Sequence, residues 1–316
     1  MADKPSRALV LFGDGLARFV HPSHLHLHSL AADGFCGFLS LPNSPPSESE
    51  DERIVREFAV LLDAYETYLT TSKQDADENS QRSSIKHSLS DRFMGMKAAL
   101  LTKNSSLKSF GAKLGFSVLQ LDELVKACNA DLQVNVEALE LLKLLGFQEG
   151  KVADTNHLDI IFYHIGAGES VESNEQKVIA ADMEYVNSLV GGIMCQAQPG
   201  SDISSRLHLS VVMSYGNVSM YDSSKFSVSK SGENSHLSTL LPSQSYTMKG
   251  EIPREDVRHH CPMLIAQWQH AVTRKDNAEK FSFNDFKEHG GNLTIPADRF
   301  LHEIAFKLWK APKYGA

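Results

Sequence analysis

The residues ALVLFGDG, at positions 8–15, decide the fold class of this chain. Five apolar residues lead into Asp14, an aspartate with a glycine on each side. A short apolar run of this kind is typical of a buried parallel strand. Open α/β sheets bind their ligands at the carboxyl ends of such strands. We therefore expect Asp14 to stand at the functional edge of a parallel sheet.

Further apolar runs alternate with helical patterns along the chain. The clearest of these runs are LDIIFYHIGAGE, residues 158–169, and HLSVVMSYGN, residues 208–217, which both enter glycine-containing turns. Such alternation predicts an α/β fold with a mostly parallel, doubly wound sheet and helices on both faces. Residues 261–269 suit either a strand or the start of a buried helix. The other expected elements are strands at 36–41 and 116–121 and helices at 26–32, 53–69, 134–145, 174–196 and 297–311.

The 316 residues suffice for a substantial core, and we predict a single α/β domain over residues 1–316. Residues 70–90 contain almost no apolar side chains and are expected to form a polar loop. Residues 91–145 are a candidate inserted helical segment. Residues 219–249 are polar and rich in serine, which is typical of loops or edge structure.

Composition and charge exclude several classes of protein. A formal net charge of −8 argues against nucleic acid as a partner, because nucleic-acid binders normally present a basic surface. The four cysteines form no C-x-x-C pair, so neither a disulfide scaffold nor a zinc module is indicated. We see no secretory signal and no apolar stretch of roughly 20 residues that would span a membrane. The expectation is a cytoplasmic protein with no membrane partner.

Both ends of the sequence carry a family resemblance. LVLFGDGLARF, residues 9–19, followed by LHSLAADGFCGFLSL, residues 27–41, resembles the opening of the alkaline phosphatase superfamily, and most of all its cofactor-independent phosphoglycerate mutase branch. HHCPMLIAQ, residues 259–267, and FNDFKEHGGNLTIPADRFLHEIA, residues 283–305, resemble the closing segments of that branch. The resemblance implies an alkaline-phosphatase-like fold.

The same resemblance implies roles for individual residues. Active members of the branch hold two divalent metals, manganese or zinc, and a serine attacks the phosphate. By analogy, Asp14, Glu169 and His260 are candidate metal ligands, with His259 as the alternative to His260. Ser44 matches the nucleophile and Arg18 would bind the substrate phosphate. Two simpler interpretations stay open: Asp14 could cap the helix that follows it, and Ser44 could belong to a turn before two prolines.

The expected motifs for the remaining metal ligands are missing. The branch has an Asp-x-x-Gly-His motif after one strand, where this chain has GAGESVESNEQK without histidine. It also has an Asp-His pair after the next strand, where Ser214, Tyr215 and Asn217 stand here. Hydroxyl and amide groups are poor replacements for carboxylate and imidazole ligands of zinc or manganese.

Two functions therefore stay open. The first is a non-catalytic binding protein that has lost the two-metal site and binds a partner protein or a phosphorylated small molecule, with no cofactor. The alternative is an enzyme, a metal-dependent mutase-like phosphotransferase or phosphohydrolase with a rearranged site and two divalent metals, manganese or zinc. We favour the first, because the missing ligands are ones that the two-metal mechanism requires.

Four histidines, at positions 21, 24, 26 and 28, form a second unusual feature near the N-terminus. On a strand, the last three would share one face and could chelate zinc or nickel. On a helix they would scatter around the axis. We favour a surface stretch of titratable histidines.

Overall fold

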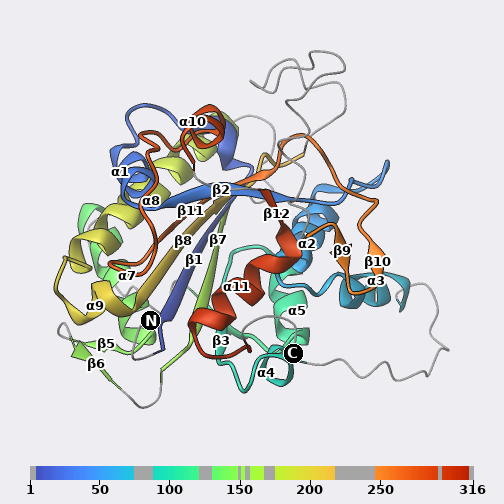
Figure 1. Ribbon diagram of the computed structural model, residues 1–316, viewed down its shortest axis with the longest axis horizontal. Helices are drawn as coiled ribbons and strands as arrows, with labels where there is room; N and C mark the ends of the chain where they lie inside the picture. The colour runs from blue at the N-terminus through green and yellow to red at the C-terminus, as the bar shows by residue number, and fades with distance from the viewer. Residues whose placement is uncertain are drawn as a thin grey trace.

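The structure is a computed structural model that describes residues 5–74, 88–120, 130–148, 151–153, 157–166, 175–217, 246–290 and 294–312. An eight-stranded sheet forms its centre, in the strand order β12-β2-β11-β8-β1-β7-β3-β4 (Figure 1). The strands are β1 (Arg7–Asp14), β2 (Phe35–Ser40), β3 (Ala98–Leu101), β4 (Ser117–Leu119), β7 (Ile160–Gly166), β8 (Leu207–Met213), β11 (Met263–Trp268) and β12 (Thr294–Pro296).

Strand β1 lies in the middle of the sheet, where all eight of its residues are buried. It pairs in parallel with β7 and β8, and Leu11 stands opposite Tyr163 on one side and Val211 on the other. Among the described strands of this sheet, β11 alone runs antiparallel to its neighbours. The structure thus confirms a mostly parallel α/β fold, and residues 263–268 are a strand.

Helices cover both faces of the sheet (Figure 1). The helices α1 (Leu25–Asp33), α7 (Ala130–Leu144), α8 (Glu175–Gln196) and α10 (Phe283–Glu288) pack on one face. The helices α2 (Glu50–Leu61), α5 (Ser105–Lys113) and α11 (Phe300–Lys307) pack on the other. Successive side chains of a strand point to opposite faces. Asp14 therefore lies on the same side as Phe12, which belongs to the core beneath α2.

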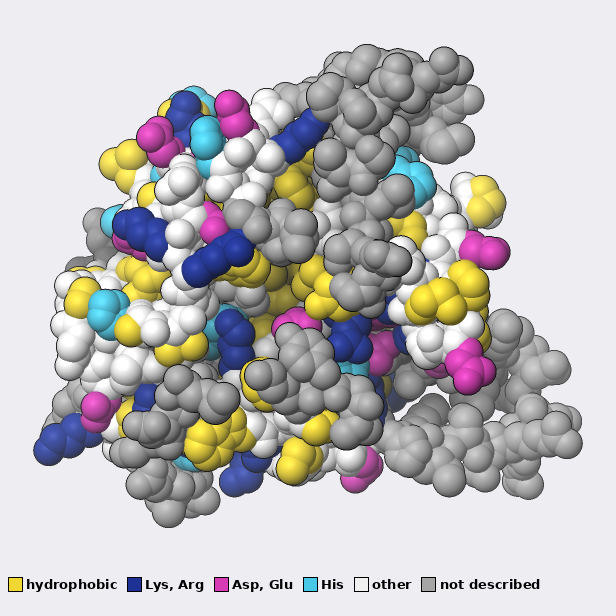
Figure 2. Space-filling model, viewed as in Figure 1, with side chains coloured by type: hydrophobic (Ala, Val, Ile, Leu, Met, Phe, Trp, Pro, Cys, Tyr) yellow, Lys and Arg dark blue, Asp and Glu magenta, His cyan; other side chains and the backbone are white. Residues whose placement is uncertain are grey.

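Smaller elements complete the described part of the chain. Two short hairpins are formed by β5 (Phe147–Gln148) with β6 (Lys151–Val152) and by β9 (Met248–Lys249) with β10 (Ile252–Pro253). Short helices are η1 (Leu16–Phe19), α4 (Leu89–Arg92), α9 (Asp202–Arg206) and η5 (Ala297–Arg299), and α3 (Tyr65–Gln74) is longer. Figure 2 shows basic and acidic side chains interspersed over one face of the molecule.

Several boundaries differ from the sequence expectation. The single helix predicted over residues 53–69 is two helices, because Asp63 adopts a left-handed backbone conformation with φ of 49° between them. The loop predicted at 70–90 begins later, since α3 continues to Gln74, and residues 75–87 lie outside the described part. Residues 91–145 contribute β3 and β4 to the main sheet as well as helices. Most of the 219–249 segment also lies outside the described residues.

Helix α8 is long and apolar enough to cross a membrane by length and composition alone, with a mean hydropathy of 1.2 over residues 177–196. Its position explains the apolar character differently. Val186, Leu189, Val190 and Ile193 are fully buried against the sheet and its neighbouring helices. A core helix of a globular domain has the same composition.

Candidate functional site

The candidate site lies where β1 and β8 end, at the carboxyl edge of the sheet. Asp14 is the last residue of β1, and Ser214 follows β8 directly. A cleft of about 650 Å³ opens beside them, with Arg18 and Tyr215 in its wall. The structure therefore places the aspartate of the GDG motif at the edge where α/β sheets bind ligands.

Asp14 is almost fully buried and forms an ion pair with Arg53 of α2. The two guanidinium nitrogens Nη1 and Nη2 donate to the two carboxylate oxygens over 3.0 and 2.6 Å. The Ser214 hydroxyl donates to the same carboxylate over 2.7 Å. Burial alone would raise the pKa of Asp14, but the charge and hydrogen bonds of Arg53 outweigh it and hold the pKa below its usual value. Asp14 is thus an ionised carboxylate whose counter-ion comes from the protein itself.

Two glycines make this arrangement possible. The Ser214 hydroxyl oxygen accepts hydrogen bonds from the backbone N–H groups of Gly15 and Gly216, over 2.9 and 3.2 Å. Both glycines have positive φ angles, 70° and 67°. A Cβ added at Gly216 would come within 3.0 Å of the Gly15 Cα. The close approach of the two turns therefore requires glycine at position 216, and the positive φ favours glycine at position 15.

Behind Asp14, a second carboxylate lies among three arginines. Glu57 of α2 is fully buried. Its oxygens lie 3.0 Å from Arg53, 3.6 Å from Arg258 and 3.9 Å from Arg56. Burial raises the pKa of Glu57, and the attraction of Arg258 and Arg53 offsets this only in part. Arg53 thus joins two buried carboxylates, Asp14 and Glu57, in one network.

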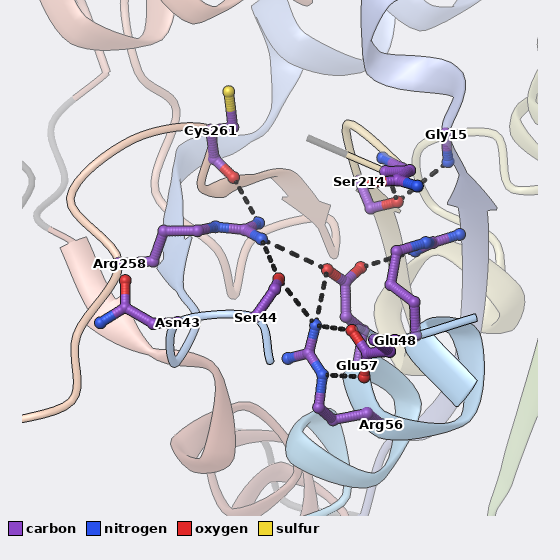
Figure 3. A network of polar contacts seen from close by, with 12 residues as sticks. Gly15, Asn43, Ser44, Glu48, Arg56, Glu57, Ser214, Arg258 and Cys261 are labelled. Atoms are coloured by element: carbon purple, nitrogen blue, oxygen red, sulfur yellow. Dashed lines mark hydrogen bonds and ion pairs between the residues drawn. The ribbon is translucent and has the colours of Figure 1, made fainter. Parts of the chain in front are cut away.

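Ser44, the candidate nucleophile, is exposed at the other end of this network (Figure 3). Its hydroxyl oxygen accepts from Arg56 Nη2 over 3.0 Å and lies 3.4 Å from Arg258 Nη1. Arg56 is also bound by Glu48, and Arg258 donates to the Cys261 carbonyl. A chain of charged contacts, Asp14–Arg53–Glu57–Arg258, therefore links the candidate metal ligand to the neighbourhood of the candidate nucleophile.

The remaining predicted site residues are placed separately. Arg18 lines the cleft with Asp14 and donates to the Asn217 carbonyl over 2.5 Å. His260 is half-buried in the segment that precedes β11. Glu169 lies outside the described residues. The structure thus brings Asp14 and Arg18 together in one cleft.

Among the residues that the structure describes, the donor set around Asp14 does not fit a two-metal centre. Three hydrogen bonds from Arg53 and Ser214 already occupy its carboxylate oxygens. Within the described ranges, no cluster of three or more histidine, cysteine, aspartate or glutamate side chains could hold a metal ion. A metal approaching Asp14 would also meet the positive charge of Arg53 at close range.

The sequence patterns alone did not indicate the arginines that define this site. Arg53, Arg56 and Glu57 lie within the amphipathic pattern of residues 53–69, among apolar positions such as Ile54 and Phe58. Charged side chains on the apolar side of a helix are the signal that could have found them, because buried charges need partners. Arg258 carries no such local signal.

Neither a protein-family model nor the sequence of a curated protein matches this chain. The PH0037 protein from Pyrococcus horikoshii is similar in structure, with a TM-score of 0.56 and 12% identity over 99% of each chain. The chain therefore shares the fold of that protein.

Two further matching structures have lower TM-scores, and the second of them is a protein in the alkaline phosphatase superfamily. One is a cofactor-independent phosphoglycerate mutase from Thermoplasma acidophilum, with a TM-score of 0.45 and 9% identity over 96% of this chain and 100% of that chain. Another, from Vibrio parahaemolyticus, has a TM-score of 0.42 and 12% identity over 86% of this chain and 62% of that chain.

Proposed function

We propose that this protein is a non-catalytic relative of the cofactor-independent phosphoglycerate mutases, which binds a ligand and has no two-metal centre. The pairing of Asp14 with Arg53 is the observation that carries the proposal. A guanidinium is permanently charged, so it supplies to Asp14 the positive charge that a metal ion would bring. It also fills both carboxylate oxygens in a bidentate geometry that leaves Asp14 poorly suited to coordinate a metal.

The residues that follow β8 support the same proposal. Ser214 is engaged by Asp14, Gly15 and Gly216, and it serves the structure of the turn. Burial raises the pKa of Tyr215 well above its usual value, so its hydroxyl stays protonated at neutral pH. A protonated phenol is a weak metal ligand compared with a carboxylate or an imidazole.

The cleft beside Asp14 is the proposed binding site. Its volume of about 650 Å³ is in the range of small-molecule sites. Arg18 provides a permanent cation in its wall, next to the backbone of Gly15 and Gly216. Arginine binds phosphate oxygens well. We therefore propose a phosphorylated small molecule as the ligand, and a partner protein is the other occupant to test.

Metal content and turnover test the loss of the metal centre. The purified chain should contain no stoichiometric manganese or zinc, and it should not hydrolyse or transfer phosphate from phosphoglycerate or a generic phosphate ester when manganese is added. Bound metal near one or two ions per chain, with turnover that Asp14→Ala abolishes, would instead establish the metal-dependent enzyme. The Lys143→Ala variant, on the exposed surface of α7, is the matched control for expression and folding.

A ligand screen tests the binding role. A panel of phosphorylated metabolites should include one that raises the thermal stability of the wild-type chain. At about a hundredfold excess over its dissociation constant, the gain is about 2.7 kcal/mol. Arg18→Ala should reduce this gain and Lys143→Ala should leave it unchanged. A panel without any stabilising compound, together with capture of a protein that Arg18→Ala still binds, would contradict the small-molecule proposal.

A further inference from the structure

The histidine-rich segment after η1 has an unusual set of hydrogen bonds. His24 Nδ1 accepts the backbone N–H of His21 over 2.9 Å. His28 Nδ1 accepts the backbone N–H of Phe281 over 3.1 Å, and His21 Nδ1 accepts the backbone N–H of Ser23 over 3.3 Å. Three imidazoles therefore use the same ring nitrogen as an acceptor of a main-chain hydrogen bond.

An imidazole nitrogen can accept only while it carries no proton. A protonated imidazole has an N–H at both ring nitrogens and is a donor at each. His28 shows the neutral form most clearly, because its Nε2 lies 3.1 Å from the His21 carbonyl oxygen, which can only accept. His28 Nε2 must therefore donate while its Nδ1 accepts. Both nitrogens of the neutral ring are used, and protonation would place an N–H against the N–H of Phe281.

These contacts also decide between the two sequence interpretations of the cluster. His26 and His28 lie in helix α1, so the alternating histidines do not share the face of a strand. The backbone already occupies the Nδ1 atoms of His21, His24 and His28. These histidines therefore serve as hydrogen-bond acceptors, and among the described residues no group of three or more histidine, cysteine, aspartate or glutamate side chains could hold a metal ion.

We infer that His21, His24 and His28 form a pH-sensitive latch, which holds helix α1 on the domain at neutral pH and releases it when the histidines are protonated. The latch joins three parts of the chain: the exit of η1, the first turns of α1, and the segment before α10. Phe281 is fully buried and packs on Phe286, so its backbone N–H has no easy access to water once the bond to His28 is broken.

The charged groups around the latch do not reverse the expected effect, which is that protonation of the histidines weakens the latch. His24 is buried, and burial lowers its pKa. Glu184 of α8 acts in the opposite direction, but its oxygen lies 4.0 Å from His24 Nε2 and its side chain is largely exposed. The other two histidines oppose a positive charge on His24. On the α10 side, Glu279 and Lys280 are exposed next to Phe281 and carry opposite charges.

A second anchor of α1 is independent of pH. The Asn187 side chain on α8 accepts the backbone N–H groups of His26 and Leu27 over 3.0 and 3.3 Å. It caps the helix from outside, since His24 makes no side-chain capping bond. Protonation therefore removes the latch while the Asn187 cap remains, which predicts a local opening of α1 and not global unfolding.

Opening of α1 has a chemical readout in Cys36. This thiol lies at the start of β2, is fully buried, and donates to the Ala31 carbonyl of α1 over 3.4 Å. A cleft of about 660 Å³ lies between α1 and α8, with Ser29 on one wall and Met194 on the other. Release of the latch should widen this cleft and uncover Cys36.

Thiol labelling of the full chain tests the latch. The wild type is compared with a His24→Asn/His28→Asn double variant, because asparagine offers an acceptor oxygen close to the place of Nδ1 and does not titrate. A disulfide reagent such as 4,4′-dithiodipyridine labels both proteins at about pH 7.5 and about pH 5.5, on either side of the usual titration of histidine. Mass spectrometry then identifies the peptide that contains Cys36.

The result is the ratio of the Cys36 labelling rate in the wild type to that in the double variant, taken at each pH. The pH dependence of intrinsic thiol reactivity cancels in this ratio. We expect equal rates at the higher pH and wild-type labelling at least about tenfold faster at the lower pH, the gain that one coupled proton produces per pH unit. A His26→Asn variant, on the same helix but outside the latch, should behave like wild type. Equal ratios at both pH values would overturn the proposal.

A second measurement does not depend on the double variant folding. Imidazole nitrogen NMR of the wild type at neutral pH should show His28 with its proton on Nε2, and hydrogen exchange should show slow exchange of the Phe281 amide. Both signals should change together as the pH is lowered. A proton on Nδ1 at neutral pH, or an amide that stays equally protected at low pH, would refute the latch.

Discussion

Replacement of Arg53 by methionine should strongly destabilise this protein, although it removes no apolar packing. The guanidinium donates to both oxygens of Asp14, to Glu57 over 3.0 Å and to Glu50 over 2.6 Å. Asp14 and Glu57 are 5% and 0% exposed, so water cannot replace these bonds. Methionine has a similar length and leaves two buried carboxylates without their shared cation.

The expected cost follows from this burial. Removal of one partner from a buried ion pair costs about 3–5 kcal/mol, because the other charge stays buried and uncompensated. Glu57 keeps Arg258 at 3.6 Å and Arg56 at 3.9 Å, so most of the loss falls on Asp14. Asp14→Asn in the Arg53→Met background removes that unpaired charge. The double variant should therefore lose less unfolding free energy than the two single variants lose in sum, by about 1–3 kcal/mol.

Urea unfolding monitored by circular dichroism measures the free energy of unfolding at neutral pH. It is applied to the wild type, the two single variants and the double variant, which together form a double-mutant cycle. The pKa of Asp14 is lowered in the folded state, so the pair stabilises the fold above the ordinary aspartate pKa of 3.8. That stabilisation is lost only as the pH falls through the lower, folded-state pKa. Exposed ion pairs contribute at most about 1 kcal/mol. A loss of unfolding free energy below this value for Arg53→Met, or strictly additive losses, would refute the claim that Arg53 is the buried counter-ion of Asp14.

Three further predictions concern other buried positions. Burial lowers the pKa of His164 to about 4, so stability should fall as the pH drops from the usual 6.5 towards 4, by up to about 3 kcal/mol, and His164→Asn should flatten this part of a urea stability–pH curve. Gly216→Ala should cost about 1–3 kcal/mol in thermal unfolding, and more than Gly200→Ala, because both have positive φ but a Cβ at Gly200 meets nothing within 4 Å. Burial raises the pKa of Glu137, so the contribution of Glu137 to the free energy of unfolding should weaken as the pH rises above 4.5. Glu137→Gln should abolish this dependence of stability on pH between acid and neutral pH. Absence of a pH slope in the wild type, or equal losses for the two glycine variants, would contradict the corresponding prediction.

The local patterns predicted the sheet well. The apolar runs at residues 8–12, 158–165 and 208–213 became β1, β7 and β8, and β1 pairs in parallel with each of the other two. A strand with a continuous apolar run is stable only where helices cover both faces of its sheet, so the apolar runs predict the layered α/β architecture. The break between α2 and α3 was not predictable in the same way, since nothing in the residues near Asp63 demands its left-handed backbone. Asp63 there meets Lys249 and His302 from distant parts of the chain.

The candidate site likewise has one part that local sequence predicts and one part that only the tertiary structure reveals. The sequence by itself determined that Asp14 ends a buried strand and faces a ligand-binding edge, because an apolar strand and a glycine turn are local properties. Only the tertiary structure decided what Asp14 binds. Arg53 lies 39 residues away and Ser214 lies 200 residues away, and both reach Asp14 through the packing of α2 and the pairing of β8. A buried charge takes whichever partner the fold brings to it, and a one-dimensional pattern does not record that choice.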